Sequence, residues 1–492
     1  MNAKTRNRQA GSVLIQAFVF GMISILIIGA LISWASINIK ASRVGLYREQ
    51  ALQIAEAGVD YYRWHLAHAS SDYKDGNATS TGPYVHDFYD KDGTKIGTFT
   101  LDITPPATGS TLVKIKSTGN VLVDPTVSRK IQVQFAIPSL AKYAVVSNDN
   151  IRFGEGTEVF GPIHSNGGIR FDGIAHNIIT SAKDKYDDPD HSGGQEFGVH
   201  THVNAPPGSG VNDTFRAAEA PPSTVPNRSD VFEAGRQFPV PAADFVGLTT
   251  DLAQIKANAQ SAGKYISSSG AQGYKIVFKT DDTFDVYKVN NLMAAPNGCS
   301  NSQSQAGWGT WSIRTTGNGN TTFIANYPIP ANGLIFVEDN VWAEGQINSA
   351  RVTLAVGKFP DNASTRPSIT VNNNLLYTNY DGTDVIALIS QGDINAGLAS
   401  ADTMRIDAAL VAQNGRAGRY YYSSNCGSSY KRNTLTLYGM IASDLRYGFA
   451  YTDGTGYDTR NITYDANLLY GPPPSFPLTS DQYSIVSWEE VQ

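Results

Sequence analysis

Residues Ser12 to Trp34 read SVLIQAFVFGMISILIIGALISW, a run of 23 residues without a charged side chain. An apolar stretch of 18 or more residues is a candidate transmembrane helix, because about 20 helical residues cross the hydrocarbon core of a bilayer. The preceding segment carries Lys4, Arg6 and Arg8 and no acidic residue. The positive-inside rule therefore predicts that the N-terminus starts in the cytoplasm and that the rest of the chain is exported.

The position of the small residues distinguishes this segment from a cleaved signal peptide. A signal peptide has a shorter apolar region, and its small-residue cleavage site follows that region. Here the small residues Gly11 and Ser12 come before or at the start of the apolar run. Cleavage between them would leave the hydrophobic helix in the mature chain. An ordinary signal-anchor with the same basic flank is the alternative.

The helix is predicted to continue beyond the apolar run, to about His68. From Ser36 to His68 there is no proline, and apolar residues recur at helical spacing opposite a charged face. At 1.5 Å per residue the whole helix would be about 80 Å long. The apolar positions of its second half are Leu46, Leu52, Ala55, Val59, Tyr62 and Leu66.

The basic leader ending in Gly11, the apolar run, and the segment EQALQIAEAGVDYY from Glu49 to Tyr62 resemble the N-terminal region of type IV minor pilins and pseudopilins, in particular the PilX type. The resemblance covers only this N-terminal region. It implies a prepilin leader (1–11) cut by prepilin peptidase after Gly11 and methylation of the new N-terminus at Ser12. It also implies a stalk helix (12–68) that packs with other pilins and minor pilins in a filament.

Gln16 departs from the pattern of the major pilins. These carry a glutamate at the fifth mature position, where it neutralises the N-terminal amine of a neighbouring subunit. Counted from Ser12, which replaces the usual Phe, the fifth residue is Gln16. Its amide costs less to hold in lipid than a carboxylate, but it cannot form the ion pair. The large tip pseudopilin also lacks the acid, so Gln16 favours a tip or priming position. A tolerated amide without such a role is the alternative.

The composition is typical of an exported, β-rich protein. Of the 492 residues, 17% are charged and 46 are glycine, and the length allows at least two folded units beyond the helix. The net charge of −6 and the absence of Lys or Arg runs argue against nucleic acid as a partner. In an exported chain Cys299 and Cys426 can form a disulfide, and two free thiols are the alternative.

The predicted fold class is mainly β with a long N-terminal α-helix. Residues 69–138 form a pilin-like small α+β module with the helix, because four segments after a polar hinge alternate with the period of half-buried strands. These segments are Tyr84–Tyr89, Ile96–Ile103, Thr111–Asn120 and Val127–Ile137.

Two later blocks, 139–183 and 331–492, repeat short apolar strands that end in Asn, Asp or Gly corners, at intervals of roughly 15–20 residues. This pattern predicts a right-handed parallel β-helix-like domain, with the C-terminal tail folding back on the body. An antiparallel sandwich is the alternative. The insertion between the blocks, 184–330, contains a loop, a helix (242–265) and a β-hairpin (273–289), and is expected to pack on the β-helix or cap its end.

One group of residues in the insertion could bind a metal. A His-x-His pair on one strand face with a nearby carboxylate can hold a transition metal ion. Acids in loops of exported proteins also cap turns or bind calcium weakly, which is the alternative. No cofactor is expected otherwise. The metal candidates are Asp187, Asp190, His191, His200 and His202, beside Asp188.

No enzyme motif was found: the chain has no Gly-x-Ser-x-Gly elbow, no glycine-rich phosphate loop and no Cys-x-x-Cys pair. Parallel β-helices do include polysaccharide lyases and hydrolases that use paired carboxylates. Here no acidic pair has a spacing that fixes a facing geometry, so a non-enzymatic role is expected. The scattered candidates are Glu338, Asp339, Glu344, Asp393 and Asp407.

The expected function is therefore that of a structural minor pilin-like component of a type IV pilus or related secretion filament. It would reside in the inner (cytoplasmic) membrane before assembly and then on the pilus at the cell surface, at the tip, for priming or for adhesion to host or surface glycans. The alternatives are a membrane-anchored extracellular β-helix enzyme acting on polysaccharide and a static anchored envelope protein.

Overall fold

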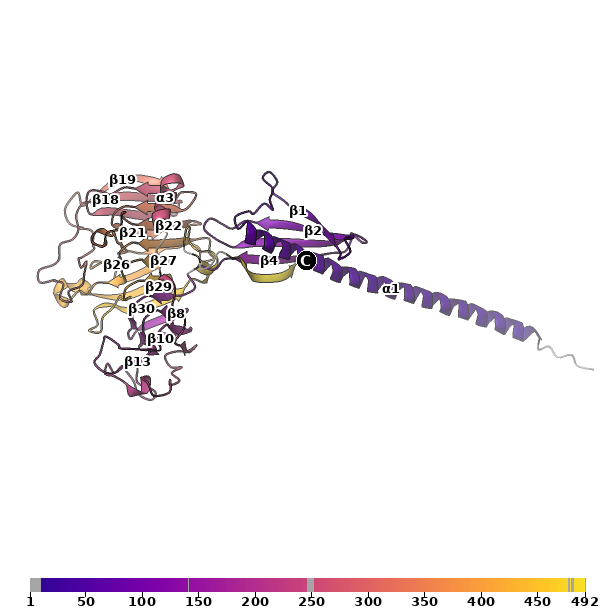
Figure 1. The fold of residues 1–492 in the computed structure, drawn as a ribbon, viewed down its shortest axis with the longest axis horizontal. Coiled ribbons are helices and arrows are strands. Elements are labelled where there is room, and N and C mark those ends of the chain that lie inside the picture. The colour runs from indigo at the N-terminus through magenta and orange to yellow at the C-terminus, as the bar shows by residue number, and fades with distance from the viewer. Residues whose placement is uncertain (1–9, 140, 246–251, 477, 479–481, 492) are drawn as a thin grey trace, which may run out of the picture. The chain divides into compact units, whose positions relative to one another are not determined.

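The computed structural model describes residues 10–139, 141–245, 252–476, 478 and 482–491, so most of the predicted leader lies outside the described residues. The chain forms two compact units (Figure 1). Unit 1 comprises Met1–Pro105, Val113–Ala136 and Gln482–Gln492, and unit 2 comprises Pro106–Leu112 and Ile137–Asp481. The predicted class, mainly β with a long N-terminal helix, is confirmed.

Unit 1 is one long helix packed on a small antiparallel sheet. The helix α1 runs unbroken through Ala10–His68, as the periodicity predicts. The sheet has the order β1-β2-β3-β4-β31, and every neighbouring pair is antiparallel. Its strands are β1 (Tyr84–Tyr89), β2 (Lys95–Thr104), β3 (Val113–Val121), β4 (Ser128–Ala136) and β31 (Ser484–Val491).

The fifth strand, β31, comes from the C-terminal tail. It pairs with β4, with Trp488 opposite Val133, and so closes the free edge of β4. The sequence prediction placed 484–491 with the second β-helix block, 331–492, and built the small module from 69–138 alone. The structure differs because the alternating tail finds an unpaired sheet edge, where its backbone groups are satisfied.

The second half of α1 provides the core of unit 1. The apolar face of the helix lies against the sheet, and the side chains on both sides of this contact are buried. Gly119 in β3 marks the closest approach: a Cβ at this position would lie 2.0 Å from the carbonyl oxygen of Ala51 and 2.6 Å from the amide nitrogen of Ala55. The buried helix residues are Ala51, Ile54, Ala55, Val59, Tyr62 and Leu66.

Gly119→Ala is expected to destabilise unit 1 by about 1–3 kcal/mol, the usual cost of overpacking, because the helix must move off the sheet. Gly45→Ala is the matched control, since a Cβ there meets nothing within 4 Å and alanine favours a helix. Thermal unfolding of the full chain in detergent, followed by circular dichroism, measures both. Equal unfolding temperatures for the two variants would contradict the close helix–sheet contact.

Unit 2 is built from short strands. The predicted segments recur as strands of two to thirteen residues between Asn, Asp and Gly corners. In chain order the strands are β5 (Val145–Ser147), β6 (Ile151–Phe153), β7 (Thr157–Phe160), β8 (Ile163–Ser165), β9 (Ile169–Phe171), β10 (Ile174–Ala175), β11 (Ile179–Ser181), β12 (Lys185–Tyr186), β13 (Glu196–Phe197), β14 (Val199–His200), β15 (Arg236–Gln237), β16 (Lys264–Ile266), β17 (Gly273–Phe278), β18 (Thr283–Val289), β19 (Thr321–Pro328), β20 (Leu334–Val337), β21 (Val341–Gln346), β22 (Arg351–Val356), β23 (Ile369–Thr370), β24 (Leu375–Leu376), β25 (Val385–Ser390), β26 (Ile394–Ala396), β27 (Thr403–Ala412), β28 (Ala417–Arg419), β29 (Lys431–Ser443) and β30 (Gly456–Tyr464).

These strands stack in parallel, as a β-helix requires. One face follows the order β16-β20-β22-β25-β27-β29-β5-β8-β11-β15, with parallel pairing at every step. The two blocks predicted from the sequence therefore join into a single stack, in which the later block ends at β29 and the earlier block continues from β5. The predicted parallel β-helix-like architecture is confirmed, and the antiparallel sandwich is wrong.

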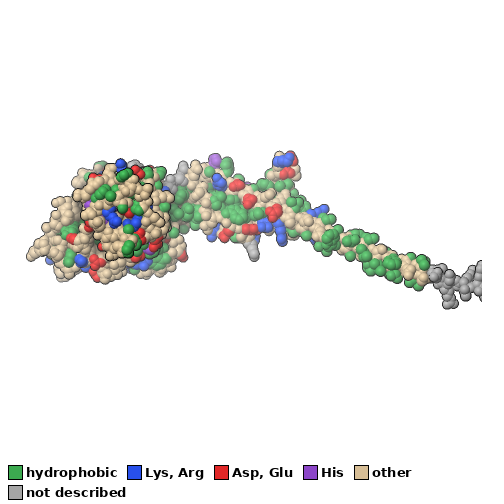
Figure 2. Space-filling view, turned by 90° about the horizontal axis from the view of Figure 1, so that it is seen from below, with side chains coloured by type: hydrophobic (Ala, Val, Ile, Leu, Met, Phe, Trp, Pro, Cys, Tyr) green, Lys and Arg blue, Asp and Glu red, His purple; other side chains and the backbone are tan. Residues whose placement is uncertain are grey.

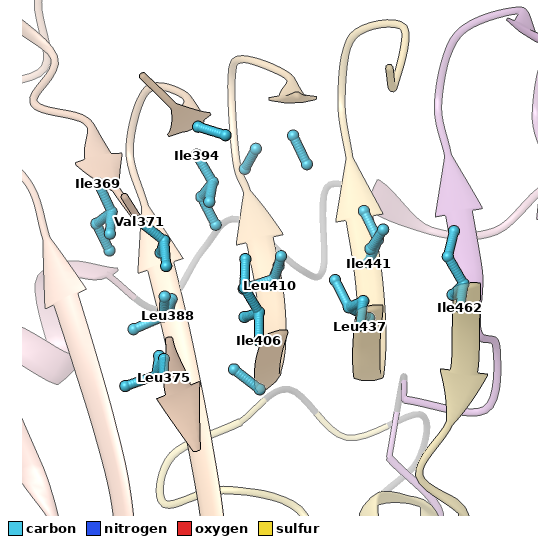
Figure 3. Packing of buried hydrophobic residues seen from close by; sticks show 14 of the residues in the cluster. Ile369, Val371, Leu375, Leu388, Ile394, Ile406, Leu410, Leu437, Ile441 and Ile462 are labelled. Carbon is cyan, nitrogen blue, oxygen red and sulfur yellow. The ribbon is translucent and has the colours of Figure 1, made fainter. Parts of the chain in front are cut away.

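The interior of unit 2 is filled by aliphatic side chains in register. Leu354, Leu388 and Leu410 lie opposite one another on β22, β25 and β27, and Ile441 and Val145 continue the row. Figure 3 shows Leu388, Leu410 and Ile441 side by side on consecutive strands. Because each rung contacts only its neighbours, this ladder supplies the apolar burial that holds the stack together.

The insertion occupies both ends of the stack. At one end β17 pairs in parallel with β21, and β18 and β19 extend it as antiparallel strands (Figure 1). The hairpin 273–289 is thus present, with β19 as a third strand that the sequence analysis missed. Such a cap protects the open sheet edge of a solenoid.

The predicted helix 242–265 is shorter in the structure. The described helix, α3, spans Leu252–Ala262 and buries Leu252, Ile255 and Ala259 against the outside of the β-helix. Residues 264–266 form β16 instead, because they find parallel pairing with β20. Part of the prediction, 246–251, lies outside the described residues.

Candidate functional site

The first half of α1 is not covered by any part of the chain that the structure describes. Among the described residues, α1 is the one helix long and apolar enough to cross a membrane, and its most apolar window is entirely unburied. Figure 2 shows hydrophobic side chains along this half of the helix. Between Val13 and Ile39 the large apolar side chains are 45–72% exposed. Such a surface is stable in lipid or against other apolar helices, and not in water.

The residues predicted for processing and filament packing lie at the start of this helix. Gly11 and Ser12 are in the first turn of α1, and Gln16 is exposed one turn later. Their roles in cleavage, methylation and filament packing therefore remain predictions.

The structure brings together three of the residues predicted as metal candidates. His191, His200 and His202 meet in a cluster with Asp188 and Glu196, in which the candidate ligand atoms all lie within 4.8 Å of one another. All five side chains are at most 3% exposed. They come from the segment that contains β12, β13 and β14, next to the end of the stack.

Glu196 is at the centre of this cluster. Its Oε2 atom lies 2.7 Å from Nε2 of His200, 2.9 Å from Nε2 of His191 and 3.0 Å from Nε2 of His202. Asp188 Oδ2 lies 3.5 Å from Nε2 of His200 and 3.6 Å from Nε2 of His191. Three imidazoles and two carboxylates thus point at one small volume.

The remaining two candidates do not belong to the cluster. Asp187 is exposed to solvent. Asp190 accepts a bidentate ion pair from Arg446 and lies 3.4 Å from Arg152, so its carboxylate is already neutralised. The two carboxylates in the cluster are instead Asp188 and Glu196.

The cluster strongly perturbs its ionisable groups. Burial raises the pKa of Glu196, but contacts with His200 and His202 outweigh it and hold the pKa well below its usual range. Burial likewise raises the pKa of Asp188, and His200 outweighs it, so that the pKa falls to about 2. Burial lowers the pKa of His200, and Asp188 and Glu196 reverse the effect and raise it. The two carboxylates are therefore ionised at neutral pH.

One buried guanidinium group, that of Arg170, lies beside the carboxylate side of the cluster. Arg170 in β9 is fully buried, donates to Asp172 at 2.7 Å, also pairs with Asp213, and lies 3.8 Å from Asp188. Asp172, which follows β9, also accepts the backbone N–H of His202 at 2.9 Å. These contacts tie the cluster to the β-helix.

Cys299 and Cys426 form a disulfide in the structure, across 127 residues of sequence. Both cysteines are buried in a small cluster with Leu398, Tyr420 and Tyr422. The bond fastens the segment between β18 and β19 to the segment between β28 and β29.

The five carboxylates considered for catalysis are each engaged in a structural contact. Glu338 binds Lys256 and Tyr265, Asp407 binds Arg405 and Tyr380, and Glu344 binds Lys275. Asp339 accepts from Ser268 and Ser269, and Asp393 from Tyr420.

Unit 2 also carries a polar cleft of about 720 Å³. Its lining mixes arginines with acids and aromatic rings. The lining includes Asp149, Arg152, Glu155, Tyr451 and Arg460.

The comparisons with known proteins identify no family for this chain. No protein-family model and no curated protein matches the chain. Among solved structures it is similar to the "competence-associated pilin ComZ from Thermus thermophilus", with 14% sequence identity and a TM-score of 0.29, over 90% of this chain and 98% of that chain.

Proposed function

We propose that this chain is a minor pilin-like subunit of a type IV pilus or a related secretion filament. One observation carries the proposal. A single unbroken helix, α1, leaves its N-terminal half bare and apolar and buries its C-terminal half on an antiparallel sheet. The bare half suits storage in the inner membrane and later packing against the helices of other pilins, because both environments cover apolar side chains.

The β-helix is the part that such a subunit would display at the cell surface. A tip or priming position fits Gln16, which cannot form the ion pair that major pilins make with a neighbour. Adhesion to host or surface glycans fits the polar cleft of unit 2, where arginine, acid and tyrosine side chains face a volume suited to a polar ligand. In this proposal the protein has no catalytic role.

The mature N-terminus tests the proposal. When the full chain is expressed with a prepilin peptidase, mass spectrometry is expected to find a chain that begins at Ser12 with a methylated amine. Gly11→Val is expected to abolish cleavage and leave the whole chain in the membrane. Gly21→Val is the matched control, because it makes the same change inside the apolar run, where a Cβ meets nothing within 4 Å.

Two results would overturn the proposal. One is a wild-type chain that keeps Met1 in the presence of the peptidase. The other is a chain that begins downstream of Trp34, which would make the apolar run a removable signal.

A membrane-anchored enzyme acting on polysaccharide is the rival function, and the cleft is the observation that favours it, since Asp149 and Glu155 line it together. Incubating the full chain with anionic polysaccharides, while following unsaturated or newly reducing ends, distinguishes the two functions. Product formation that is lost in Glu155→Gln would favour the enzyme.

A further inference from the structure

Two of the three histidines of the cluster, His200 and His202, are oriented as metal ligands. Nδ1 of His202 lies 2.7 Å from the carbonyl oxygen of Asn212, and Nδ1 of His200 lies 3.3 Å from that of Phe197. A carbonyl oxygen only accepts hydrogen bonds, so each Nδ1 carries the hydrogen. In a neutral imidazole the other nitrogen, Nε2, then holds a lone pair, and both Nε2 atoms point into the cluster. Metal-binding histidines typically show this backbone-anchored tautomer.

In the neutral, metal-binding form, the Nε2 lone pairs of His200 and His202 point toward the carboxylate of Glu196. They lie 2.7 Å and 3.0 Å from Oε2 of Glu196, which is also an acceptor. Nε2 of His200 and Oδ2 of Asp188 make no hydrogen bond, even though burial removes them from water: the two side chains are 0% and 2% exposed. Nε2 of His191 and of His202 make hydrogen-bond contacts with Glu196, so the unpaired atoms are Nε2 of His200 and Oδ2 of Asp188, which lie 3.5 Å apart. A cation between these two atoms would satisfy both of them.

We propose that Asp188, His191, Glu196, His200 and His202 bind one divalent transition metal ion, with zinc as the expected occupant. Imidazole nitrogens with carboxylate oxygens are zinc ligands, and atoms bound about 2.1 Å from zinc lie about 3.4 Å apart in a tetrahedral site. The separations of 3.5 and 3.6 Å around Asp188 agree with this value, whereas those of 2.7–3.0 Å around Glu196 are shorter.

The charges agree with a divalent ion. With neutral imidazoles the five ligands carry two negative charges, from Asp188 and Glu196. The nearest guanidinium, that of Arg170, is 3.8 Å from Asp188 and is held more closely by Asp172 and Asp213. A divalent cation neutralises the two carboxylates without a second buried arginine. Calcium fits poorly, because it prefers oxygen ligands.

The site is structural rather than catalytic. All its ligands come from the protein, and their burial leaves no open coordination position of the kind that catalytic zinc sites keep. They lie within the fifteen residues 188–202, a segment in which β12, β13 and β14 are two residues long. The metal would therefore fix this segment over the end of the β-helix, much as zinc organises small domains that lack a large core.

Metal analysis of the full chain tests the site. The protein is purified in detergent without a metal-chelating tag, stripped with chelator and reloaded with Zn²⁺ or Co²⁺. We expect one metal ion per chain and, with Co²⁺, the visible d–d absorption of a nitrogen- and oxygen-ligated site. Because this measurement needs no variant, it does not depend on how well any substitution folds.

Ligand variants locate the ion. Glu196→Gln and His202→Gln are expected to weaken Zn²⁺ binding by more than the 10–100-fold that outer-shell changes cost. His176→Gln is the matched control: His176 also contacts two carboxylates, Glu233 at 2.7 Å and Glu158 at 3.6 Å, but at the surface. The His176→Gln variant is expected to bind Zn²⁺ as tightly as the wild type does.

Proteolysis tests the structural role. Chelator is expected to speed tryptic cleavage after Lys185, an exposed residue of β12 at the start of the segment, several-fold, and added Zn²⁺ to restore protection. The site would be refuted by a wild-type chain that binds neither Zn²⁺ nor Co²⁺, by a His176→Gln variant that loses the metal as the ligand variants do, or by cleavage unaffected by chelator. None of these results bears on cleavage at Gly11.

Discussion

Leu388→Asp is expected to unfold the β-helix of unit 2. Leu388 is fully buried in the central ladder, opposite Leu354 on one side and Leu410 on the other. Losing the leucine costs about 2–3 kcal/mol of apolar burial, and an unpaired carboxylate in that place costs several more. The sum, roughly 5 kcal/mol or more, is comparable to the whole stability of an ordinary domain. We expect loss of the β-sheet signal in circular dichroism, or insoluble protein.

Leu445→Asp is the matched control, because it makes the same change at a side chain that is 48% exposed. Exposed substitutions usually change stability by no more than about 0.5 kcal/mol, so the control is expected to unfold like the wild type. Limited proteolysis adds a second measurement. In Leu388→Asp the cleavages should fall within 137–481 and spare the helix and sheet of unit 1. A soluble variant that resists protease would show that the ladder does not hold the stack together.

Much of this fold could be predicted from the sequence, because local patterns specify it. The charge-free run after Ser12 and the helical spacing up to Leu66 require no knowledge of the rest of the chain to predict α1. The alternation in 96–103 and 113–120 predicts β2 and β3 equally directly. The short apolar strands with polar corners indicated a solenoid before any pairing was known.

The order of the rungs could not be predicted, because it depends on pairing between segments distant in sequence. Nothing local to β29 indicates that Ile441 lies beside Val145, almost 300 residues earlier. The same holds for β31, which joins the sheet of unit 1 rather than the block before it. Strand pairing of this kind is set by free edges in the folded chain.

The histidine cluster was partly predictable for the same reason. The His-x-His spacing of His200 and His202 predicted that the two rings lie together, and they do, although β14 ends at His200 and His202 lies beyond it. Glu196 was missed, although it lies only four residues before His200. The choice of Asp188 over Asp187 and Asp190 depended on the positions of Arg446 and Arg152, which are distant in sequence. Alternation gave a signal for Asp188 alone, because Asp188 lies two residues after Tyr186. The structure buries both of these residues and leaves Lys185 and Asp187 exposed.

Removing the disulfide is expected to be the second large perturbation of unit 2. The Cys299–Cys426 bond closes a loop of 127 residues. In the chain-entropy account, a cross-link of this span restricts the unfolded chain by about 5 kcal/mol at 25 °C. Cys299→Ala with Cys426→Ala should therefore lower the unfolding temperature of unit 2 by about 10 °C. Differential scanning calorimetry of the full chain in detergent measures this change.

Two comparisons identify the bond as the cause. The wild type in the presence of a reductant should unfold at the same temperature as the double variant, and the reductant should not change the double variant further. Around the bond, Trp308 donates to the carbonyl oxygen of Tyr421 at 3.0 Å, and Tyr422 donates to that of Gly309 at 2.7 Å. These contacts hold the segment between β18 and β19 independently of the sulfur atoms. If they were sufficient, the double variant would unfold at the wild-type temperature, and the entropic role of the cross-link would be disproved.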